Sequence, residues 1–247
     1  MKKKKAILIF LGFTLFVLLA GAGWLYNTCG TALCGDEGSV VLYVDRDDNI
    51  DSVYHKLSAT SANAKINKFK KVAKWADYGD AVKVGRYEVG KKMSTWQVVR
   101  NLRNGIQSPV MLTIPEVWTL ESLAAKISRK LMADSAELIQ VFTDSAMCAK
   151  YGVKSETMVC LFIPDTYEIY WNVAPEKLLE RMHREYQNYW NDERVAKAKA
   201  KGLTPHEAIT LASIAYKETM KSEENPIVAG LYLNRLKKGM KLQACPT

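Results

Sequence analysis

The amino-acid sequence predicts an α+β protein in which two modules follow an apolar N-terminal helix. Three observations support this prediction. Residues 6–26 are uncharged and mostly apolar, short runs rich in β-branched residues recur after them, and the segments between these runs place apolar residues at helical spacing. With 247 residues, 48% of them hydrophobic, the chain is long enough to bury more than one core.

The N-terminus predicts a membrane span. Four lysines precede residues 6–26, whose length is about the 20 residues that cross a bilayer as a helix. Basic residues beside a span stay in the cytosol, so residues 1–5 are expected to form a cytoplasmic tail and the chain from about residue 30 onward to lie outside the cytosol. A cleaved signal peptide is the alternative, because "AGA" at 20–22 suits cleavage. The length of the apolar run favours an uncleaved, single-pass anchor.

The charge of the chain excludes some partners. The formal net charge is +9, and Lys2–Lys5 supply four of the 35 basic residues, which leaves 31 basic against 26 acidic residues beyond them. This mild excess suits an anionic polymer or a membrane face and argues against nucleic acid as a partner.

Neither a metal nor an organic cofactor is expected. The five cysteines show no CxxC or Cys/His spacing, the three histidines are dispersed, and no glycine-rich phosphate loop occurs.

The first module is expected at 39–106, after a linker at 27–38. "SVVLYVD" predicts a strand, "NIDSVYHKLSA" and "ANAKINKFKKVAKWA" two helices, and "VKVGRYEV" a second strand. "STWQVVRNLRNG" predicts another helix with a capping box from Ser94 to Gln97 and a stop at Gly105. Together these elements predict a small α+β unit.

The second module is expected at 107–247. It begins with a strand at 110–114, followed by helices at "TLESLAAKISRKL" and "DSAELIQVF", the latter capped by Asp134 and Glu137. The aromatic segment "LFIPDTYEIYWN" precedes a long helical segment, "APEKLLERMHREYQNYWNDERVAKAKAKG". Two further helices begin at "TPHE", where Thr204 and Glu207 form a capping box, and at "NPIV".

One carboxylate interrupts an otherwise ordinary pattern. Leu211, Ile214, Ala215 and Glu218 fall on one stripe of the helix that begins at "TPHE", so Glu218 continues its apolar face. The helix could end there with Glu218 in solvent, as most glutamates are. Alternatively, Glu218 is a partly buried general acid, because poor solvation favours the protonated form. The local pattern leaves both interpretations open.

Several motifs together resemble the MltG (YceG-like) family of endolytic lytic transglycosylases of bacterial peptidoglycan. They are the basic N-terminus with its single span, "VGRYEV", "LTIPEVWTLESLAAKI", "FIPDTYEIYWN", "LASIAYKET" and "IVAGLYLNRLKKGMKLQACPT". They follow the family order over nearly the whole chain beyond the span. The resemblance implies that 39–106 is a LysM-like module and 107–247 the YceG-like catalytic domain.

The resemblance also implies a catalytic residue. In this family the helix reads A-S-I-x-E-K-E-T, and the second glutamate, which matches Glu218, is the catalytic one. Cleavage of a glycosidic bond requires a proton for the leaving oxygen while oxocarbenium character develops on the sugar. In the family, the C6 hydroxyl of the same N-acetylmuramic acid replaces water and leaves a 1,6-anhydro end. One carboxyl can therefore serve first as acid and then as base.

Three polar residues are candidate substrate contacts. Asp165 in "PDTY" could position glycan, although Asp after Pro is equally typical of a turn. Asn234 and Gln243 carry neutral amides that suit N-acetyl and hydroxyl groups, although Asn234 could instead bridge helix ends.

Aromatic residues of the same segment are a second group of candidates. Tyr167, with Tyr170 and Trp171 beside it, could stack on sugar rings, but aromatic residues at this spacing are more often part of the core. We include Tyr167 among the predicted substrate-binding residues.

The sequence departs from the family at several positions. Tyr216 replaces the first glutamate of E-K-E-T, Val159 and Cys160 stand where Glu-Gly is common, and Cys245 stands where the family has Asp. The chain ends inside the "LQACPT" motif, so we expect it to be a fragment with an incomplete catalytic domain.

Two classes of function that involve glycan remain open, beside a third, a helical envelope adaptor with no affinity for glycan. An anchored transglycosylase would act on nascent glycan strands, at the outer face of the bacterial cytoplasmic membrane, with peptidoglycan synthases as protein partners. A noncatalytic wall-binding or scaffold protein would hold glycan without cutting it, and the changes at Tyr216 and Cys245 favour that alternative.

Overall fold

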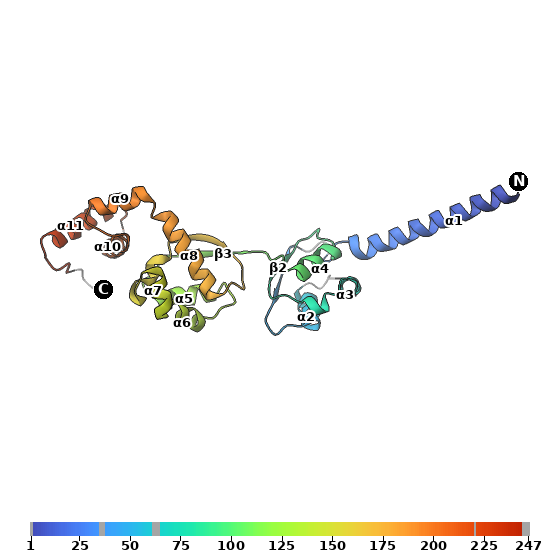
Figure 1. Ribbon diagram of the computed structural model, residues 1–247, viewed down its shortest axis with the longest axis horizontal. Coiled ribbons are helices and arrows are strands. Elements are labelled where there is room, and N and C mark those ends of the chain that lie inside the picture. Colours follow the sequence, from blue (N-terminus) through green and yellow to red (C-terminus); the bar gives the residue numbers. More distant parts are fainter. Residues whose placement is uncertain (1, 35–37, 61–64, 220, 244–247) are drawn as a thin grey trace. The chain divides into compact units, whose positions relative to one another are not determined.

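The protein is mostly helical and carries two small sheets, as the computed structural model shows for residues 2–34, 38–60, 65–219 and 221–243 (Figure 1). It divides into two compact units. Unit 1 comprises Met1–Val110 and Glu168–Asn172, and unit 2 comprises Met111–Tyr167 and Val173–Thr247. The predicted α+β class is confirmed at this level. The division at residue 110 lies close to the predicted boundary, but the assignment of 168–172 to unit 1 was not predicted.

The N-terminal helix is long and apolar. Helix α1 spans Lys2–Leu25 and continues into a π turn, η1, at Tyr26–Gly30. Within it, Phe10–Gly30 has a mean hydropathy of 1.5 and none of its most apolar window is buried. The π turn is held by the Thr28 hydroxyl, which donates to the Trp24 carbonyl at 2.9 Å. By length and composition this helix is consistent with a membrane anchor or a signal sequence.

Unit 1 is built on a two-stranded antiparallel sheet. Strand β1 (Val40–Val44) pairs with β2 (Gly85–Val89), in a register that places Leu42 opposite Tyr87. Helices α2 (Ile50–Thr60), α3 (Ile66–Trp75) and α4 (Thr95–Asn104) complete the unit, with the short turn η2 (Gly79–Ala81). The predicted order of strand, two helices, strand and helix is confirmed. Its fully buried core includes Leu42, Val44, Val53, Leu57, Phe69, Val72, Val99 and Leu102.

The local signals for α4 are confirmed in detail. The Ser94 hydroxyl accepts from the Gln97 N–H, and the Gln97 side chain accepts from the Ser94 N–H, which completes the capping box. Gly105 ends the helix with φ of 70°, in the left-handed region that favours glycine.

The prediction of a linker at 27–38 is wrong for its described part. Leu33 and Cys34 have no exposed surface and belong to the core of unit 1. The Leu33 N–H donates to the Met93 carbonyl at 3.2 Å, and its carbonyl accepts from the Lys65 N–H at 3.1 Å. These apolar side chains pack into the unit because burial removes them from water. The segment therefore ties α1 to the unit rather than acting as a tether.

The helices of unit 2 pack around a short 3-10 segment. Segment η3 (Ser155–Leu161) contacts α5 (Leu120–Ser128), α6 (Ser135–Thr143), α7 (Ser145–Tyr151) and α8 (Pro175–Tyr189). Strands β3 (Val110–Ile114) and β4 (Asp165–Ile169) pair in a second sheet. The predicted capping box of Asp134 and Glu137 is present at α6. Buried residues of this core include Leu112, Leu123, Ile127, Leu138, Phe142, Met158, Leu161, Leu179 and Met182.

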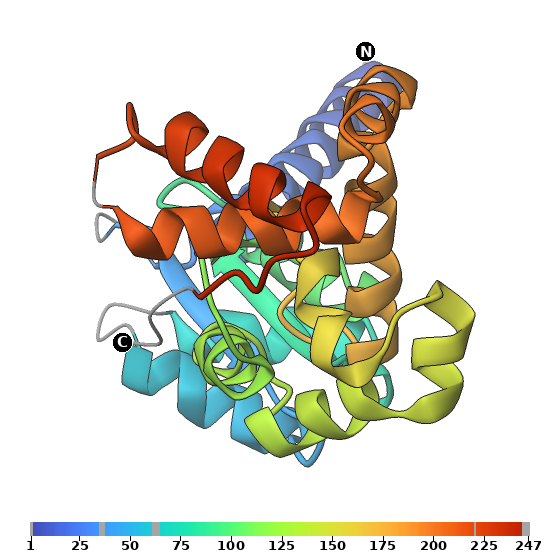
Figure 2. The same cartoon turned by 90° about the vertical axis from the view of Figure 1, so that its left-hand side faces the viewer.

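The long helical segment that follows "APEK" is not continuous. Helix α8 ends at Tyr189 and α9 spans Asp192–Ala200, because Asn191 acts as an N-cap: its side chain accepts from the Arg194 N–H at 3.0 Å. The Arg194 guanidinium also donates to the Tyr189 carbonyl at 2.7 Å and lies 4.3 Å from the Tyr189 ring centre. Two further helices, α10 (Pro205–Glu218) and α11 (Asn225–Lys237), pack against each other (Figure 2).

The burial of Leu33 can be tested by stability. Leu33→Ala in the full chain should lower the free energy of unfolding of unit 1 by about 2–5 kcal/mol, because it opens a cavity in a packed core. Denaturant unfolding in detergent micelles measures this value. Leu25→Ala is the matched control, since Leu25 is 52% exposed and its truncation should cost less than about 0.5 kcal/mol. Equal effects of the two substitutions would show that the segment is a tether after all.

Candidate active site

Helix α10 begins as predicted. The Thr204 hydroxyl accepts from the Glu207 N–H at 3.3 Å, and the Glu207 carboxylate accepts from the Thr204 N–H at 2.8 Å, with Pro205 at the first helical position. The Thr204 N–H and hydroxyl both donate to the Glu207 carboxylate, and these two bonds hold the pKa of Glu207 below its ordinary value. The expected apolar stripe is also present, since Leu211 and Ala215 are buried.

Glu218 is the last residue of α10, and its side chain is exposed. The helix ends there because Thr219 adopts an extended conformation, with φ of −141° and ψ of 141°. Of the two interpretations that the sequence leaves open, the helix end with Glu218 in solvent is confirmed and the partly buried carboxyl is wrong. The carboxylate remains accessible to a large substrate such as a polymer.

The turn after Glu218 is fixed by Glu224, which the sequence did not single out for a role. The Thr219 hydroxyl donates to the Glu224 carboxylate at 2.6 Å, and Lys221 Nζ lies 3.3 Å from the same carboxylate. Lys221 N–H in turn donates to the Thr219 hydroxyl at 3.1 Å. Met220, within this turn, lies outside the described residues. The bonds from Glu224 hold the end of α10 close to the start of α11.

A cavity of about 860 Å³ lies within unit 2. Its walls come from the loop after β3, from η3, from the segment before β4, from the end of α8, and from α10 and the start of α11. Polar groups around it are few, as is usual for pockets that bind organic ligands. The lining includes Glu116, Trp118, Val159, Cys160, Phe162, Pro164, Trp190, Ala212, Ser213, Ala215, Tyr216 and Asn225.

Tyr216 is the last residue of α10 that lines this cavity, and Glu218 is not among the lining residues. Residues three and four apart share a helix face, and the lining positions Ile209, Ser213 and Tyr216 follow that spacing. Glu218 continues the neighbouring stripe of Leu211 and Ala215, of which Ala215 touches the cavity. The helix thus carries the carboxylate beside the face that lines the cavity.

The other predicted site residues do not gather at this cavity. Asp165 is exposed at the start of β4, and its carboxylate accepts from the Thr166 N–H at 2.7 Å. Asn234 is exposed on α11, and Gln243 is exposed with φ of 52°. None of the three is among the lining residues. They remain accessible to a ligand that extends along the surface.

Tyr167 belongs to the core of unit 2. Its side chain is 7% exposed, and its hydroxyl donates to the Ile163 carbonyl at 2.7 Å. Burial raises its pKa to about 12. The core interpretation of this residue therefore accounts for its position without a ligand. Tyr170 is 56% exposed, whereas Trp171 is half-buried, with its ring centre 5.0 Å from that of Tyr43.

Besides Tyr216, two of the departures from the family pattern line the cavity. Val159 and Cys160 belong to η3, and burial raises the pKa of the Cys160 thiol. A neutral, largely buried thiol there adds apolar surface to the wall. Cys245, the third departure of this kind, lies outside the described residues.

Sequence reasoning missed a carboxylate that does face the cavity. Glu116 lies in the loop after β3 and lines the cavity beside Tyr216, where its carboxylate raises the pKa of the Tyr216 hydroxyl. The available signal was "IPEVWT", in which a carboxylate and an aromatic residue follow a strand end. The partner lies 100 positions further along the chain, so no local pattern could reveal the pair.

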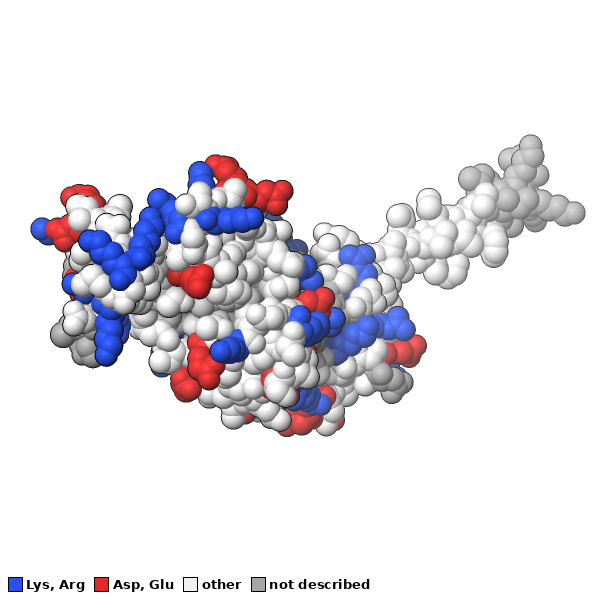
Figure 3. Space-filling view, turned by 60° about the vertical axis from the view of Figure 1, so that its left-hand side comes forward, with Lys and Arg blue, Asp and Glu red and all other residues white. Residues whose placement is uncertain are grey.

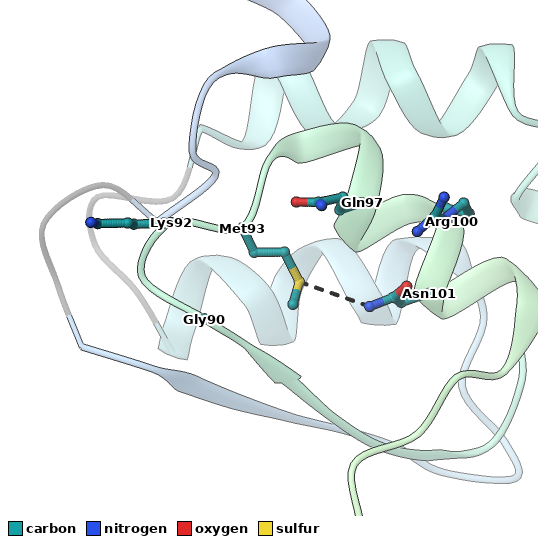
Figure 4. A pocket seen from close by; sticks show the side chains of 6 residues that line it. All are labelled: Gly90, Lys92, Met93, Gln97, Arg100 and Asn101. Atoms are coloured by element: carbon teal, nitrogen blue, oxygen red, sulfur yellow. Dashed lines mark hydrogen bonds between the residues drawn. The ribbon is translucent and has the colours of Figure 1, made fainter.

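Unit 1 has a smaller pocket of about 360 Å³ around the start of α4. It is lined by Lys92, Met93, Gln97, Arg100 and Asn101, and the Asn101 amide donates to the Met93 sulfur at 3.9 Å (Figure 4). Gly90 completes the lining. Two cationic side chains beside an apolar thioether suit a ligand that is partly anionic.

Charges are mixed over the surface. Figure 3 shows Lys and Arg side chains interspersed with Asp and Glu on the face that it views. Several charged residues form ion pairs along a helix, such as the exposed pair of Lys197 with Glu193 at 2.7 Å and the half-buried pair of Arg181 with Glu185 at 2.8 Å. Such pairs contribute little to stability.

The fold matches that of a known protein. The crystal structure of a YceG-like protein from Listeria monocytogenes aligns with 84% of this chain and 73% of its own, with a TM-score of 0.50 and 21% sequence identity. At this identity the likeness defines the fold class alone.

Sequence comparison defines the family. The profile of the YceG-like family matches residues 42–247, and the chain therefore belongs to the YceG-like family. Two proteins named endolytic murein transglycosylase, from Streptococcus pneumoniae strains D39 and R6, are each 30% identical to it over 208 residues. These alignments cover 71% of this chain and 36% of each relative, so the chain spans about a third of the length of these relatives.

The core position of Tyr167 leads to a prediction. Tyr167→Phe should lower the free energy of unfolding by about 1 kcal/mol, because the Ile163 carbonyl loses its donor, and should leave glycan binding unchanged. Denaturant unfolding and cosedimentation with purified peptidoglycan measure the two effects. Tyr170→Phe, at an exposed tyrosine, serves as the control. Unchanged stability together with weaker sedimentation would assign Tyr167 to the substrate site instead.

Proposed function

We propose that this protein is a membrane-anchored lytic transglycosylase that cleaves peptidoglycan glycan strands internally, with Glu218 as the general acid and base. The observation that carries the proposal is the position of Glu218 within a YceG-like chain. It ends the helix whose "LASIAYKET" segment resembles the family's catalytic motif, and that helix forms one wall of the 860 Å³ cavity.

The relatives support the substrate class. Both Streptococcus pneumoniae proteins are named for endolytic cleavage of murein, the polymer of the bacterial wall. An exposed carboxylate suits a polymer, because a strand that is cut internally extends beyond the catalytic group in both directions. Asp165, Asn234 and Gln243 are accessible polar side chains that we propose as contacts along the strand. Tyr167 contributes indirectly, since its hydroxyl fixes the segment before Asp165.

The chemistry follows from the carboxyl group. Protonated Glu218 gives its proton to the oxygen that links C1 of N-acetylmuramic acid to the next sugar, and the C1–O bond breaks. The C6 hydroxyl of the same muramic acid then bonds to C1, and its proton passes to the Glu218 carboxylate. The products are one strand with a 1,6-anhydro end and one with a free hydroxyl. The carboxyl regains its proton, so no further acid is consumed.

The N-terminal helix fits this function. We propose that α1 is an uncleaved anchor, with residues 1–5 in the cytosol and both units on the outer side of the membrane. Nascent glycan is made at that face, so an anchored enzyme meets strands before they are cross-linked. We further propose that unit 1 acts as a LysM-like module, in which the pocket around Gln97 and Arg100 holds glycan.

A noncatalytic glycan-binding protein is the second candidate. The observation that favours it is the arrangement of α10, which presents Tyr216 rather than a glutamate to the cavity and leaves Glu218 outside the lining. Such a protein would hold strands near the membrane without cutting them.

The two candidates differ in their products. The full-length protein, in detergent micelles, should release muropeptides with 1,6-anhydro ends from uncross-linked peptidoglycan strands, as measured by mass spectrometry. Glu218→Gln keeps the size of the side chain and removes the transferable proton, so it should lower product formation about 100-fold or more. Glu223→Gln, at an exposed glutamate that follows α10, is the matched control and should retain activity.

Three outcomes separate the possibilities. Loss of product in Glu218→Gln alone supports the proposal. Anhydro products from both variants would remove Glu218 from the catalytic role. Absence of anhydro products from the parent protein, together with retained cosedimentation with peptidoglycan, would establish the noncatalytic alternative.

A further inference from the structure

Three residues that the proposed mechanism does not use meet at the cavity in unit 2. Glu116 and Trp118 lie in the loop after β3, and Tyr216 lies in the last turn of α10. The Glu116 carboxylate lies beside the Tyr216 hydroxyl and raises its pKa. The Trp118 and Tyr216 ring centres are 6.3 Å apart, and their planes are inclined by 32°. The two rings thus form adjacent parts of one wall.

We propose that Glu116, Trp118 and Tyr216 form a platform that binds an N-acetylhexosamine ring of the glycan strand. The platform lies on the face of α10 next to the Glu218 stripe, so it would hold the strand beside the carboxyl group. The inference rests on the proposed function for the class of ligand, and it adds the residues that position that ligand.

The exposure of the rings supports this assignment. Trp118 is 46% exposed and Tyr216 is 50% exposed, although both line a cavity. Aromatic residues of a folded core would be covered by other side chains, as Tyr167 is in the same unit. A pyranose ring has an apolar face of C–H groups, and covering it with an aromatic ring removes apolar surface of both partners from water.

The polar groups around the rings match the edge of the same sugar. A carboxylate has two oxygens with about four acceptor positions, so Glu116 can accept from Tyr216 and also from a sugar hydroxyl or an acetamide N–H. Lys217 Nζ lies 5.1 Å from the Trp118 ring centre and offers donors at the side of the platform. An acceptor, a donor and two ring faces are the groups that a hydroxylated, N-acetylated ring requires.

A tyrosine at position 216 fits a sugar-binding platform better than a glutamate would. A glutamate would give the cavity a second carboxylate near Glu116, and like charges at short range repel. Tyrosine instead places a hydroxyl beside Glu116 and adds a ring face. At this part of the wall the β3 loop therefore supplies a carboxylate, and α10 supplies aromatic surface.

A purely structural role makes a different prediction. The contact between Tyr216 and Glu116 could serve only to hold the β3 loop against α10. In that case, loss of the hydroxyl alone should weaken sugar binding as much as loss of the whole side chain. Tyr216→Phe removes the hydroxyl and keeps the ring, whereas Tyr216→Leu removes both. The pair therefore separates a sugar platform from a loop contact.

Binding of a neutral oligosaccharide tests the platform. The probe is tetra-N-acetylchitotetraose, titrated by calorimetry into the full-length protein in detergent, in a Glu218→Gln background that removes the proposed acid. Tyr216→Leu and Trp118→Leu should each raise Kd about tenfold, and Tyr216→Phe should raise it less than about threefold. Glu116→Gln should weaken binding to an intermediate degree. Trp75→Leu is the matched control at an exposed tryptophan of α3, outside the cavity, and should leave Kd unchanged.

The outcomes are distinct from those of the proposed catalysis. Equal Kd values for Tyr216→Leu, Trp118→Leu and the parent background would overturn the platform, as would absence of tetraose binding to the parent. Equal weakening by Tyr216→Phe and Tyr216→Leu would assign the pair to loop fixation and overturn it too. Because no turnover is measured, failure of Glu218 as the acid leaves this binding result intact.

Discussion

The packing of η3 is the interaction on which the rest of unit 2 depends. This 3-10 segment contacts five helices, α5, α6, α7, α8 and α10, and buries Met158 and Leu161 completely among them. Burying two side chains of this size contributes about 1.5–3 kcal/mol each. The opposite side of the same segment, through Val159 and Cys160, forms part of the cavity wall. The cavity is therefore attached directly to the core, and its shape follows from the packing that stabilises the unit.

The orientation of helix α10 links the core of unit 2 to the candidate site. Its contact with η3 and α11 uses the stripe of Leu211 and Ala215, so the orientation of the helix about its own axis is fixed by burial. Once that orientation is set, the spacing of 3.6 residues per turn decides which side chain faces the cavity. Tyr216 does so, and the Glu116 carboxylate meets it from the β3 loop. Helix α10 and the β3 loop thus bring an aromatic ring and a carboxylate to the same wall.

Local features could be read from the sequence, and contacts between distant residues could not. The capping boxes at Ser94, Asp134 and Thr204 were predicted because each involves residues three positions apart. Leu33 was assigned to a linker because the residues that bury it lie far along the chain. The partnership of Glu116 with Tyr216 was missed for the same reason. The helix break at Asn191 has a local signal, the N-cap residue itself, but the strongly helical composition on both sides of it conceals that signal.

The exposure of Glu218 constrains how the proposed acid could work. The proposed reaction requires a proton on Glu218 when the bond breaks, and the surroundings of this exposed side chain depend on what binds beside it. A glycan strand that lies on the platform and extends past the end of α10 would itself cover the carboxyl. Loss of water around a carboxyl favours its neutral state, so the substrate would complete the environment that the acid needs. The fixed turn formed by Thr219 and Glu224 supports this arrangement, because it holds the helix end in place before the strand arrives. In such a site, binding of the strand would favour protonation of the acid. The rate would then depend on the position of the sugar as well as on the carboxyl group.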